Sequence, residues 1–283
     1  MNDFHDYRLW QTIQQDNALH AGVLISVCRS AGSVPREVGA RMWWRPSCTL
    51  GTIGGGQLEH QALAMAAALQ VDLDVGEGEG ECRLERFPLA ARAGQCCGGT
   101  VWLYFEGVPA QALGQRGDRV INLNEQLQWH DVLPVAPPPL YLFGLGHVGQ
   151  AVMKLADYLP CPLITHDERT HVEDDALTLI QTAVAGSKFL IMTHSHALDL
   201  TLCAAVLQRG DAAYCGLIGS ASKRQQFIAK LQARGIDPTT LTCPIGAQGQ
   251  GQGQGQQGMS KIPEHIAIAV AQELINLHAQ PIH

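Results

Sequence analysis

The chain has 283 residues, of which 46% are hydrophobic and 16% are charged, and its formal net charge is −7. The length predicts two domains, and the composition excludes a disordered chain and a coiled coil. The negative charge removes the general electrostatic argument for binding nucleic acid. No continuous apolar run of about 20 residues suggests a membrane span, and the polar N-terminus lacks the apolar core of a signal peptide. We therefore expect neither a nucleic-acid nor a membrane partner.

The first half predicts a mixed α+β domain at residues 1–130. Three apolar runs favour strands: Gly22–Cys28, Ala40–Trp44 and Thr100–Phe105. Strong helix formers favour a helix at Gln57–Gln70. The acidic segment Asp72–Glu85 is interpreted as an exposed loop that leads to a strand.

A proline-rich linker is predicted at residues 131–139, because such a stretch can be neither helix nor central strand. Beyond it, at residues 140–283, short apolar runs alternate with amphipathic segments. The predicted strands are Leu140–Phe143, Leu163–Thr165, Phe189–Thr193, Tyr214–Ile218 and Leu241–Thr242. The predicted helices are Val148–Tyr158, Leu200–Gln208, Ala221–Arg234 and Pro263–His278. The expected fold class is α/β, with the α+β domain followed by a Rossmann-like, doubly wound parallel sheet.

In the first half, Gly54, Gly55 and Gly56 open the predicted helix and form a potential anion site. Just upstream, 17 residues contain one acid and four arginines: Arg29, Arg36, Arg41 and Arg45. This local excess of positive charge favours phosphate binding, for which we select Arg36 and Arg41. Solvated arginines on an ordinary hairpin are the alternative.

Nine cysteines, an odd number without an export signal, predict reduced thiols and a cytoplasmic protein. Buried structural thiols are the plain interpretation for Cys28, Cys82, Cys161, Cys203 and Cys215. The adjacent Cys96 and Cys97 differ, because glycines flank them and neighbouring side chains in a strand point to opposite faces. Glycines let a bulky ligand approach, and a thiolate is a soft metal ligand. The spacing does not fit zinc, so Cys97, or failing that Cys96, is predicted to contact a heavier metal.

A glycine motif lies between a predicted strand and a predicted helix; its residues are Gly144, Gly146, His147 and Gly149. Such glycines permit a tight turn and let a phosphate approach the helix N-terminus. Asp167 ends the next predicted strand, where a carboxylate can accept hydrogen bonds from ribose hydroxyls. Alternatively, the glycines only allow close packing of strand and helix, so NAD binding does not follow from the fold.

Two later loops also lie at strand ends, where an open parallel sheet binds its ligands. The first offers His194, His196 and Asp199, which could bind a metal, act as acid and base, or simply cap a helix. Among these interpretations a polar ligand contact is favoured. The second offers Gly219, Ser220 and Lys223. A cation in the first turn opposes the helix dipole, which favours an anion-binding role for Lys223.

Seven motifs, taken in chain order, closely resemble the XdhC/CoxI family of xanthine dehydrogenase accessory proteins. They are Gly32–Met42, Gly51–Glu59, Gly94–Gly99, Gly144–Ala151, Thr193–Asp199, Gly216–Arg224 and Cys243–Gly246. The resemblance implies a chaperone, not an enzyme, that binds the molybdenum cofactor (molybdopterin) during sulfuration and inserts it into the molybdenum subunit of xanthine dehydrogenase. It also implies a cytoplasmic homodimer with a cysteine desulfurase as partner. It places the molybdenum-contacting thiol in the pair formed by Cys96 and Cys97.

The chain departs from the family after Gly246, where a Gly/Gln tract at 246–258 replaces a compact turn. Because the tract has no side chains able to form a core, it predicts a flexible surface loop. Two competing functions remain open. One is an NAD(P)-dependent oxidoreductase with His194 or His196 as proton donor, which would leave the cysteine pair and the first glycine loop unused. The other is a scaffold that recruits a molybdenum enzyme without holding cofactor.

Overall fold

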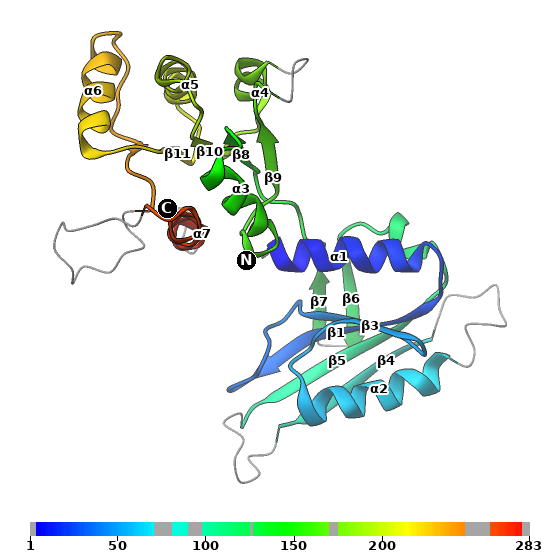
Figure 1. Cartoon of the computed structure of the whole chain (residues 1–283). Coiled ribbons are helices and arrows are strands. Elements are labelled where there is room, and N and C mark those ends of the chain that lie inside the picture. The colour runs from blue at the N-terminus through cyan, green and yellow to red at the C-terminus, as the bar shows by residue number, and fades with distance from the viewer. Residues whose placement is uncertain are drawn as a thin grey trace. The chain divides into compact units, whose positions relative to one another are not determined.

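The computed structural model describes residues 4–70, 81–89, 98–124, 127–169, 175–246 and 261–278. The chain divides into two compact units, Met1–Val135 and Ala136–His283, both drawn in Figure 1. The first is built on an antiparallel sheet and the second on a parallel sheet. In the described ranges, no helix is both long and apolar enough to cross a bilayer.

The first unit contains a five-stranded antiparallel sheet in the order β3-β2-β1-β5-β4. Its strands are β1 (Gly22–Ala31), β2 (Arg41–Arg45), β3 (Cys48–Gly51), β4 (Cys82–Pro88) and β5 (Thr100–Val108). Its helical elements are α1 (Phe4–Asn17), α2 (Gly56–Gln70) and the short η1 (Ala112–Gln115). A separate hairpin, β6 (Arg119–Asn124) and β7 (Leu127–Asp131), precedes the second unit, so the first residue of the predicted linker lies in a strand.

Alternation along β1 gives this sheet two apolar faces. Val23, Ile25 and Val27 pack with residues of α2, whereas Leu24 packs with Trp10 and neighbouring residues of α1. Figure 1 accordingly shows α1 and α2 on opposite faces of the sheet. Because successive strand residues point to opposite faces, one strand supplies both small cores.

The predicted exposed loop at Asp72–Glu85 is wrong for its last four residues. Cys82–Glu85 belong to β4, which pairs in register with β5; residues 71–80 lie outside the described residues. Ladder hydrogen bonds to β5 outweigh the weak strand preference of charged residues here, and as an edge strand β4 can keep charged side chains in water. Cys82 is consequently exposed and not a buried structural thiol.

The second unit contains a five-stranded parallel sheet in the order β12-β11-β10-β8-β9. The strands are β8 (Leu140–Phe143), β9 (Leu163–His166), β10 (Lys188–Ile191), β11 (Tyr214–Leu217) and β12 (Leu241–Thr242). The helices are α3 (His147–Lys154), α4 (Ala176–Thr182), α5 (His196–Arg209), α6 (Ala221–Gln232) and α7 (Pro263–His278), with a short η2 (Ala156–Tyr158) after α3. The predicted doubly wound sheet is confirmed, although α4 was not predicted and the helix predicted at Val148–Tyr158 is divided into α3 and η2.

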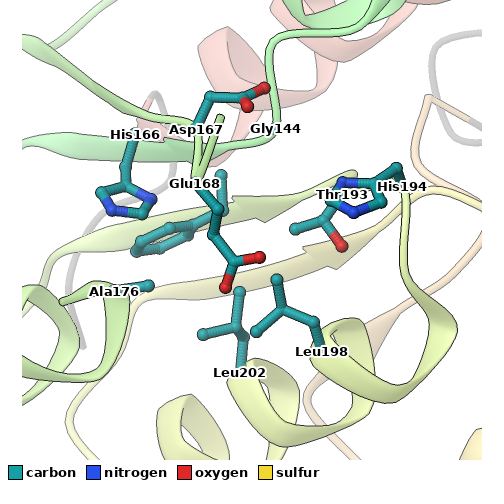
Figure 2. Close-up of a pocket in the computed structure, with 10 residues that line it drawn as sticks. Gly144, His166, Asp167, Glu168, Ala176, Thr193, His194, Leu198 and Leu202 are labelled. Carbon is teal, nitrogen blue, oxygen red and sulfur yellow. The ribbon is translucent and has the colours of Figure 1, made fainter. Parts of the chain in front are cut away.

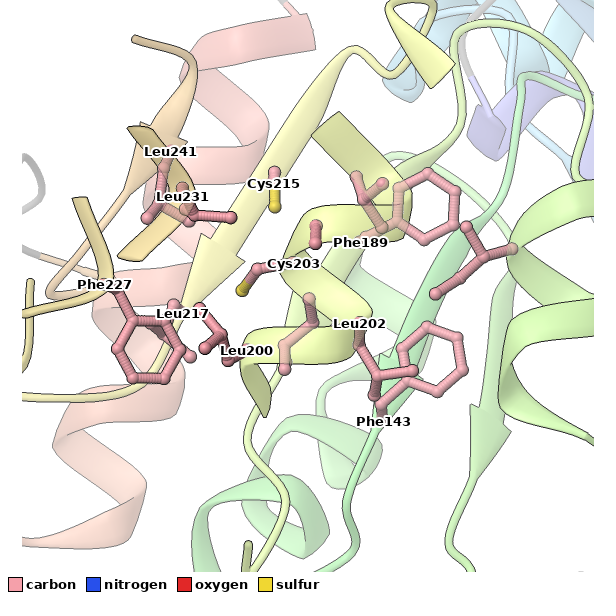
Figure 3. Packing of buried hydrophobic residues seen from close by; sticks show 14 of the residues in the cluster. Phe143, Phe189, Leu200, Leu202, Cys203, Cys215, Leu217, Phe227, Leu231 and Leu241 are labelled. Atoms are coloured by element: carbon pink, nitrogen blue, oxygen red, sulfur yellow. The ribbon is translucent and has the colours of Figure 1, made fainter. Parts of the chain in front are cut away.

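Helices cover both faces of the parallel sheet. Figure 1 shows α4, α5 and α6 along one face and α3 and α7 on the other. Figure 3 shows the core on the first face, a single buried cluster that includes Phe189 of β10, Leu202 of α5 and Phe227 of α6. Strands β8, β10 and β11 are buried along their whole length, as expected for a sheet covered on both sides.

Most cysteines in the described ranges are structural. Cys28, Cys161, Cys203 and Cys215 are buried, as predicted, and so is Cys243. Burial raises the pKa of the Cys28 thiol to about 11. A thiol that stays protonated is a poor nucleophile and metal ligand.

A buried carboxylate on α7 fixes the end of the segment after β12. Glu273 is 3% exposed and accepts hydrogen bonds from the Tyr214 hydroxyl (3.1 Å) and the Gly246 amide (2.7 Å). Burial raises the pKa of Glu273. Gly246 has a φ of 74°, which suits glycine. It is the first residue of the Gly/Gln tract, and the rest of the tract, 247–258, lies outside the described residues.

Candidate functional site

The order of strands in the second unit creates a crevice beside β8. From β8 the chain passes to β9 on one side and then to β10 on the other, so the loops after β8 and β10 leave in opposite directions. Open α/β sheets bind ligands at such a switch point, outside the carboxyl ends of the strands. The structure brings the predicted residues of the second half to this edge of the sheet. The glycine motif that begins at Gly144 follows β8, Asp167 follows β9, and the loops that lead to His194 and Lys223 follow β10 and β11.

A small hollow of about 10 Å³, with room for about one water molecule, lies at this switch point (Figure 2). Its lining combines apolar side chains such as Leu198 and Leu202 with the polar residues Asp167, Glu168 and His194. Figure 2 shows the carboxylate of Glu168 directed into the hollow, towards Leu202. Glu168 was missed by the sequence reasoning, although its position next to Asp167 at the end of β9 was a usable signal.

The three motif glycines have different surroundings. A Cβ at Gly144, where φ is +100°, would overlap the carbonyl oxygen of Met192, and a Cβ at Gly149 would overlap the carbonyl oxygen of Gly144. These two glycines are required for packing of the loop. At Gly146, by contrast, a Cβ would have nothing within 4 Å. Packing therefore explains two of the glycines and leaves Gly146 open to a ligand, the division of roles seen in phosphate-binding Rossmann loops.

The N-terminus of α3 also lacks a side-chain cap. Gly146 is its N-cap and makes no side-chain hydrogen bond, whereas Ser195 and Ser220 cap α5 and α6 and Asp175 caps α4. His147, the first residue of α3, is exposed. Amide groups at the start of a helix attract anions. At the N-terminus of α3, which faces the crevice, no side-chain cap competes with an anion for these amides.

Asp167 ties the glycine loop to the strand beside it. Its carboxylate accepts the Leu145 amide at 2.7 Å and a two-point contact from the Arg169 guanidinium at 2.7 and 2.8 Å. The hydrogen bonds from Arg169 hold the pKa of Asp167 well below its usual range, against the opposing effect of burial. Asp167 therefore stays charged in the crevice, and its role towards a ligand remains a prediction.

Asp199 and Lys223, both predicted to contact a ligand, contact each other. Lys223 Nζ lies 2.7 Å from Asp199 Oδ2, and their side chains are 11% and 0% exposed. Asp199 also accepts the amide and the hydroxyl of Thr193. The pair joins the loops after β10 and β11, and the carboxylate offsets the unfavourable position of a cation in the first turn of α6.

The histidines of the first of these loops lie apart from the buried carboxylate. His194 lines the hollow, His196 is the exposed first residue of α5, and Asp199 is buried beneath them. Among the residues that the structure describes, no group of His, Cys, Asp and Glu side chains could hold a metal ion.

In the first unit, a carboxylate of the chain itself occupies the predicted anion site. Gly54, Gly55 and Gly56 all have positive φ angles and lead into α2. Glu59, in the first turn of α2, accepts the amides of Ile53 (3.0 Å) and Gly55 (2.9 Å). The Thr52 hydroxyl also donates to it. The chain's own carboxylate therefore accepts the loop amides, and the binding of an external anion by Gly54, Gly55 and Gly56 stays a prediction.

Three of the four clustered arginines pair with acids that are distant in sequence. Arg36 Nη2 lies 3.4 Å from Asp6, Arg41 Nη2 lies 2.6 Å from Asp131, and Arg45 Nη2 lies 2.9 Å from Asp16. Arg41 is 6% exposed and also donates to the carbonyl oxygens of Gly39 and Val132. The local charge excess seen in the sequence is therefore balanced by the fold for these three residues.

The predicted metal-contacting thiols, Cys96 and Cys97, lie outside the described residues. Their segment joins β4 to β5, whose ends are held together by pairing of Pro88 with Thr100 and by the Leu89 amide on the Gly99 carbonyl. The assignment of these thiols stays a prediction.

Comparison with known proteins gives matches in both units. A family model described as the XdhC Rossmann domain matches residues 140–274, and one described as the XdhC and CoxI family matches residues 17–74. A solved structure described as a xanthine dehydrogenase from Bacillus halodurans superposes with a TM-score of 0.69 at 18% identity, covering 96% of this chain and 95% of that chain. At that identity the likeness establishes a shared fold. No curated protein matches the chain.

Proposed function

Because the chain belongs to the XdhC and CoxI family, as its motifs suggested, we propose that it is an accessory factor for a xanthine dehydrogenase and not itself a catalyst. In this proposal its cargo is the molybdenum cofactor, a pterin with a phosphate ester and a dithiolene-bound metal. The chain holds the cargo during sulfuration and passes it to the molybdenum subunit of the dehydrogenase. A cysteine desulfurase is the proposed sulfur source, and the working form is proposed to be a homodimer.

The observation that carries the proposal is the open position at Gly146. The residues of the crevice fit a phosphate-bearing ligand there, because a ligand atom can approach the backbone where a side chain would otherwise project. The uncapped N-terminus of α3 supplies amide donors for the phosphate. Glu168, directed into the neighbouring hollow, can accept hydrogen bonds from the amino group of a heterocycle such as a pterin.

The other crevice residues act on the shape of the site. Asp167 fixes the glycine loop through the Leu145 amide, and the Asp199–Lys223 pair fixes the two loops after β10 and β11. Rigid support of this kind lowers the ordering cost of binding. A thiol of Cys96 or Cys97 is proposed as the contact to molybdenum, since a soft thiolate suits this metal.

Gly146→Val tests the proposal without disturbing the fold. The backbone of Gly146 is extended (φ −68°, ψ −171°), which a valine adopts readily, and its Cβ would meet nothing. Protein purified from molybdenum-replete cells should carry fluorescent oxidisable pterin and molybdenum, and the variant should lose most of both while keeping the circular dichroism spectrum. Gly117→Val, at another open glycine, is the matched control. Normal pterin content in Gly146→Val would reject the crevice as the cargo site.

The thiols are tested separately by Cys96→Ala, Cys97→Ala and the double variant. We expect the double variant to retain less molybdenum per pterin than the wild type, because it lacks the proposed thiolate contact to the metal. Unchanged molybdenum retention in all three variants would contradict a role for the pair.

An NAD(P)-dependent oxidoreductase is the second candidate, favoured by the same division of glycine roles. In this alternative His194, which lines the hollow, would act as the proton donor. Reconstitution of apo xanthine dehydrogenase distinguishes the accessory factor from the oxidoreductase. Cargo-loaded protein should restore hydroxylase activity to apo xanthine dehydrogenase, whereas steady reduction of nicotinamide by the isolated chain would establish the oxidoreductase.

A further inference from the structure

Three side chains form one row across the sheet of the first unit. Arg29 on β1 and Arg86 on β4 both pair in register with Trp102 on the strand between them, β5. Directly opposed residues in antiparallel strands point to the same face. The guanidinium carbons of Arg29 and Arg86 lie 4.7 and 5.7 Å from the centroid of the Trp102 ring. Two cations therefore flank one indole.

A β-bulge places Arg29 on this face. Val23, Ile25 and Val27 pack on α2, so simple alternation would direct residue 29 to the same apolar core. The register between β1 and β5 instead shifts between Val27 and Arg29. Bulges re-aim side chains and are frequent beside functional sites. The fold thus uses an irregularity to bring a second cation to Trp102.

The surroundings of the row are uncharged. The adjacent rows on this face are Ser26, Tyr104 and Leu84 on one side and Ala31, Thr100 and Pro88 on the other. Of the described residues on this face of the three strands, the nearest acid is Glu106, two rows away and roughly 13 Å along the strand. Glu106 is already bound by Arg116 and Arg119.

Arg29 and Arg86 also differ from other arginines of the first unit. Six of those each pair with a carboxylate: Arg36, Arg41, Arg45, Arg83, Arg116 and Arg119. Within the described ranges, the guanidinium groups of Arg29 and Arg86 have no acidic partner and remain exposed. One guanidinium would suffice to cover the indole, and a second like charge beside it is unfavourable unless an anion joins them.

We propose that Arg29, Trp102 and Arg86 form a binding site for a tetrahedral dianion, either a free oxyanion or the phosphate of a monoester. Two guanidinium forks match the oxygens of such a group, and the double negative charge matches two cations. The indole offers a stacking surface for a ring attached to the phosphate. The site is formed by the first unit alone and does not rest on the proposed function.

Isothermal titration of the full chain with two probes, inorganic phosphate and phenyl phosphate, tests the site. The wild type should bind both, and phenyl phosphate more tightly if a monoester is the natural ligand; equal affinity would indicate a free oxyanion. Arg29→Gln and Arg86→Gln should each weaken binding about tenfold or more, and the double variant should abolish it. Trp102→Leu should remove the preference for phenyl phosphate and leave phosphate binding.

Arg83→Gln is the matched control, because Arg83 lies on the same strand, faces the other side of the sheet and pairs with Glu85. It removes the same charge and should change either affinity less than about twofold. The proposal is overturned if the wild type binds neither probe, if the double variant binds as tightly as the wild type, or if Arg83→Gln weakens binding as much as Arg29→Gln.

Discussion

Each unit joins a strand to a helix through a glycine loop, and the two loops differ in what satisfies the helix N-terminus. In the first unit, Glu59 returns from the first turn of α2 and accepts the amides of the loop. In the second unit, Gly146 caps α3 without any side-chain acceptor, and the space beside it is open. The helix N-terminus after the glycine loop is therefore occupied in the first unit and open in the second.

The comparison shows what a glycine motif does and does not predict. Both loops present backbone amides at a helix N-terminus, which is the arrangement of an anion site. Whether a ligand can use that geometry depends on one further residue, here an acid in the first helical turn. Glu59 is the difference between the two loops.

The largest expected loss of stability is at the Asp199–Lys223 pair of the second unit, where a carboxylate of the chain itself, as at Glu59, holds a neighbouring loop. Asp199→Ala would leave Lys223 buried without its carboxylate and should lower the free energy of unfolding by about 3–5 kcal/mol in urea denaturation. Asp211→Ala, which removes the more exposed partner of Arg209, is the control and should cost at most about 1 kcal/mol. Equal losses would mean that the Asp199–Lys223 pair does not support the loops.

Gly144→Ala should be the next most damaging change, with a cost of roughly 3 kcal/mol, because it combines a positive φ with overlap on the Met192 carbonyl. Gly146→Ala should change the free energy of unfolding by no more than about 0.5 kcal/mol. Thermal and urea unfolding of the two variants measure the contrast. Similar costs at both positions would show that Gly146 is also a packing residue.

Glu59→Ala should convert the closed loop into an open one. Losing the acceptor for the Ile53 and Gly55 amides should cost about 1–3 kcal/mol. Added phosphate should then raise the melting temperature of the variant more than that of the wild type, because the variant has one free anion site more than the wild type. Sodium chloride at the same ionic strength controls for screening. No gain from phosphate would show that the loop cannot accept an external anion.

The smallest effect concerns pH. Burial acts to raise the pKa of Glu59, but hydrogen bonds from Thr52, Gly55 and Ile53 outweigh it, so the pKa lies below its ordinary value of 4.5. A lowered folded-state pKa gives stability that is present above the unfolded pKa and lost as pH falls through the folded one. The wild type should therefore lose more stability than Glu59→Gln on acidification below about pH 4.5. Parallel unfolding curves would contradict this.

Much of the second unit was predictable, because buried parallel strands give continuous apolar runs. Strands β8 and β12 and helix α7 have the predicted bounds. The hairpin of β6 and β7 was missed because its turn lacks the Asn-Gly or Asp-Gly signal. Helix α1 was missed because only a few residues, such as Trp10 and Ile13, contact the sheet, which makes its apolar pattern sparse.

The candidate site was predictable in its place but not in its contacts. Position at the ends of parallel strands was enough to gather Gly146, Asp167 and His194 at one edge. Ion pairs were not accessible to local reading, since Arg41 and Asp131 are 90 residues apart and Lys223 and Asp199 are 24 apart. Which residues form such pairs depends on the folded structure and cannot be predicted from a short stretch of sequence.

The contact between Glu273 and Gly246, together with the apolar residues of α7, attaches this helix to the second unit by non-covalent contacts. A protease cut within 247–260 would leave the helix held by the Glu273 carboxylate and by Val270 and Leu274 in the apolar layer shared with α3. A peptide spanning 261–278 should therefore co-elute with a chain that ends at Gly246. The protein offers a natural point for a split pair or for new termini, with reassembly as the readout.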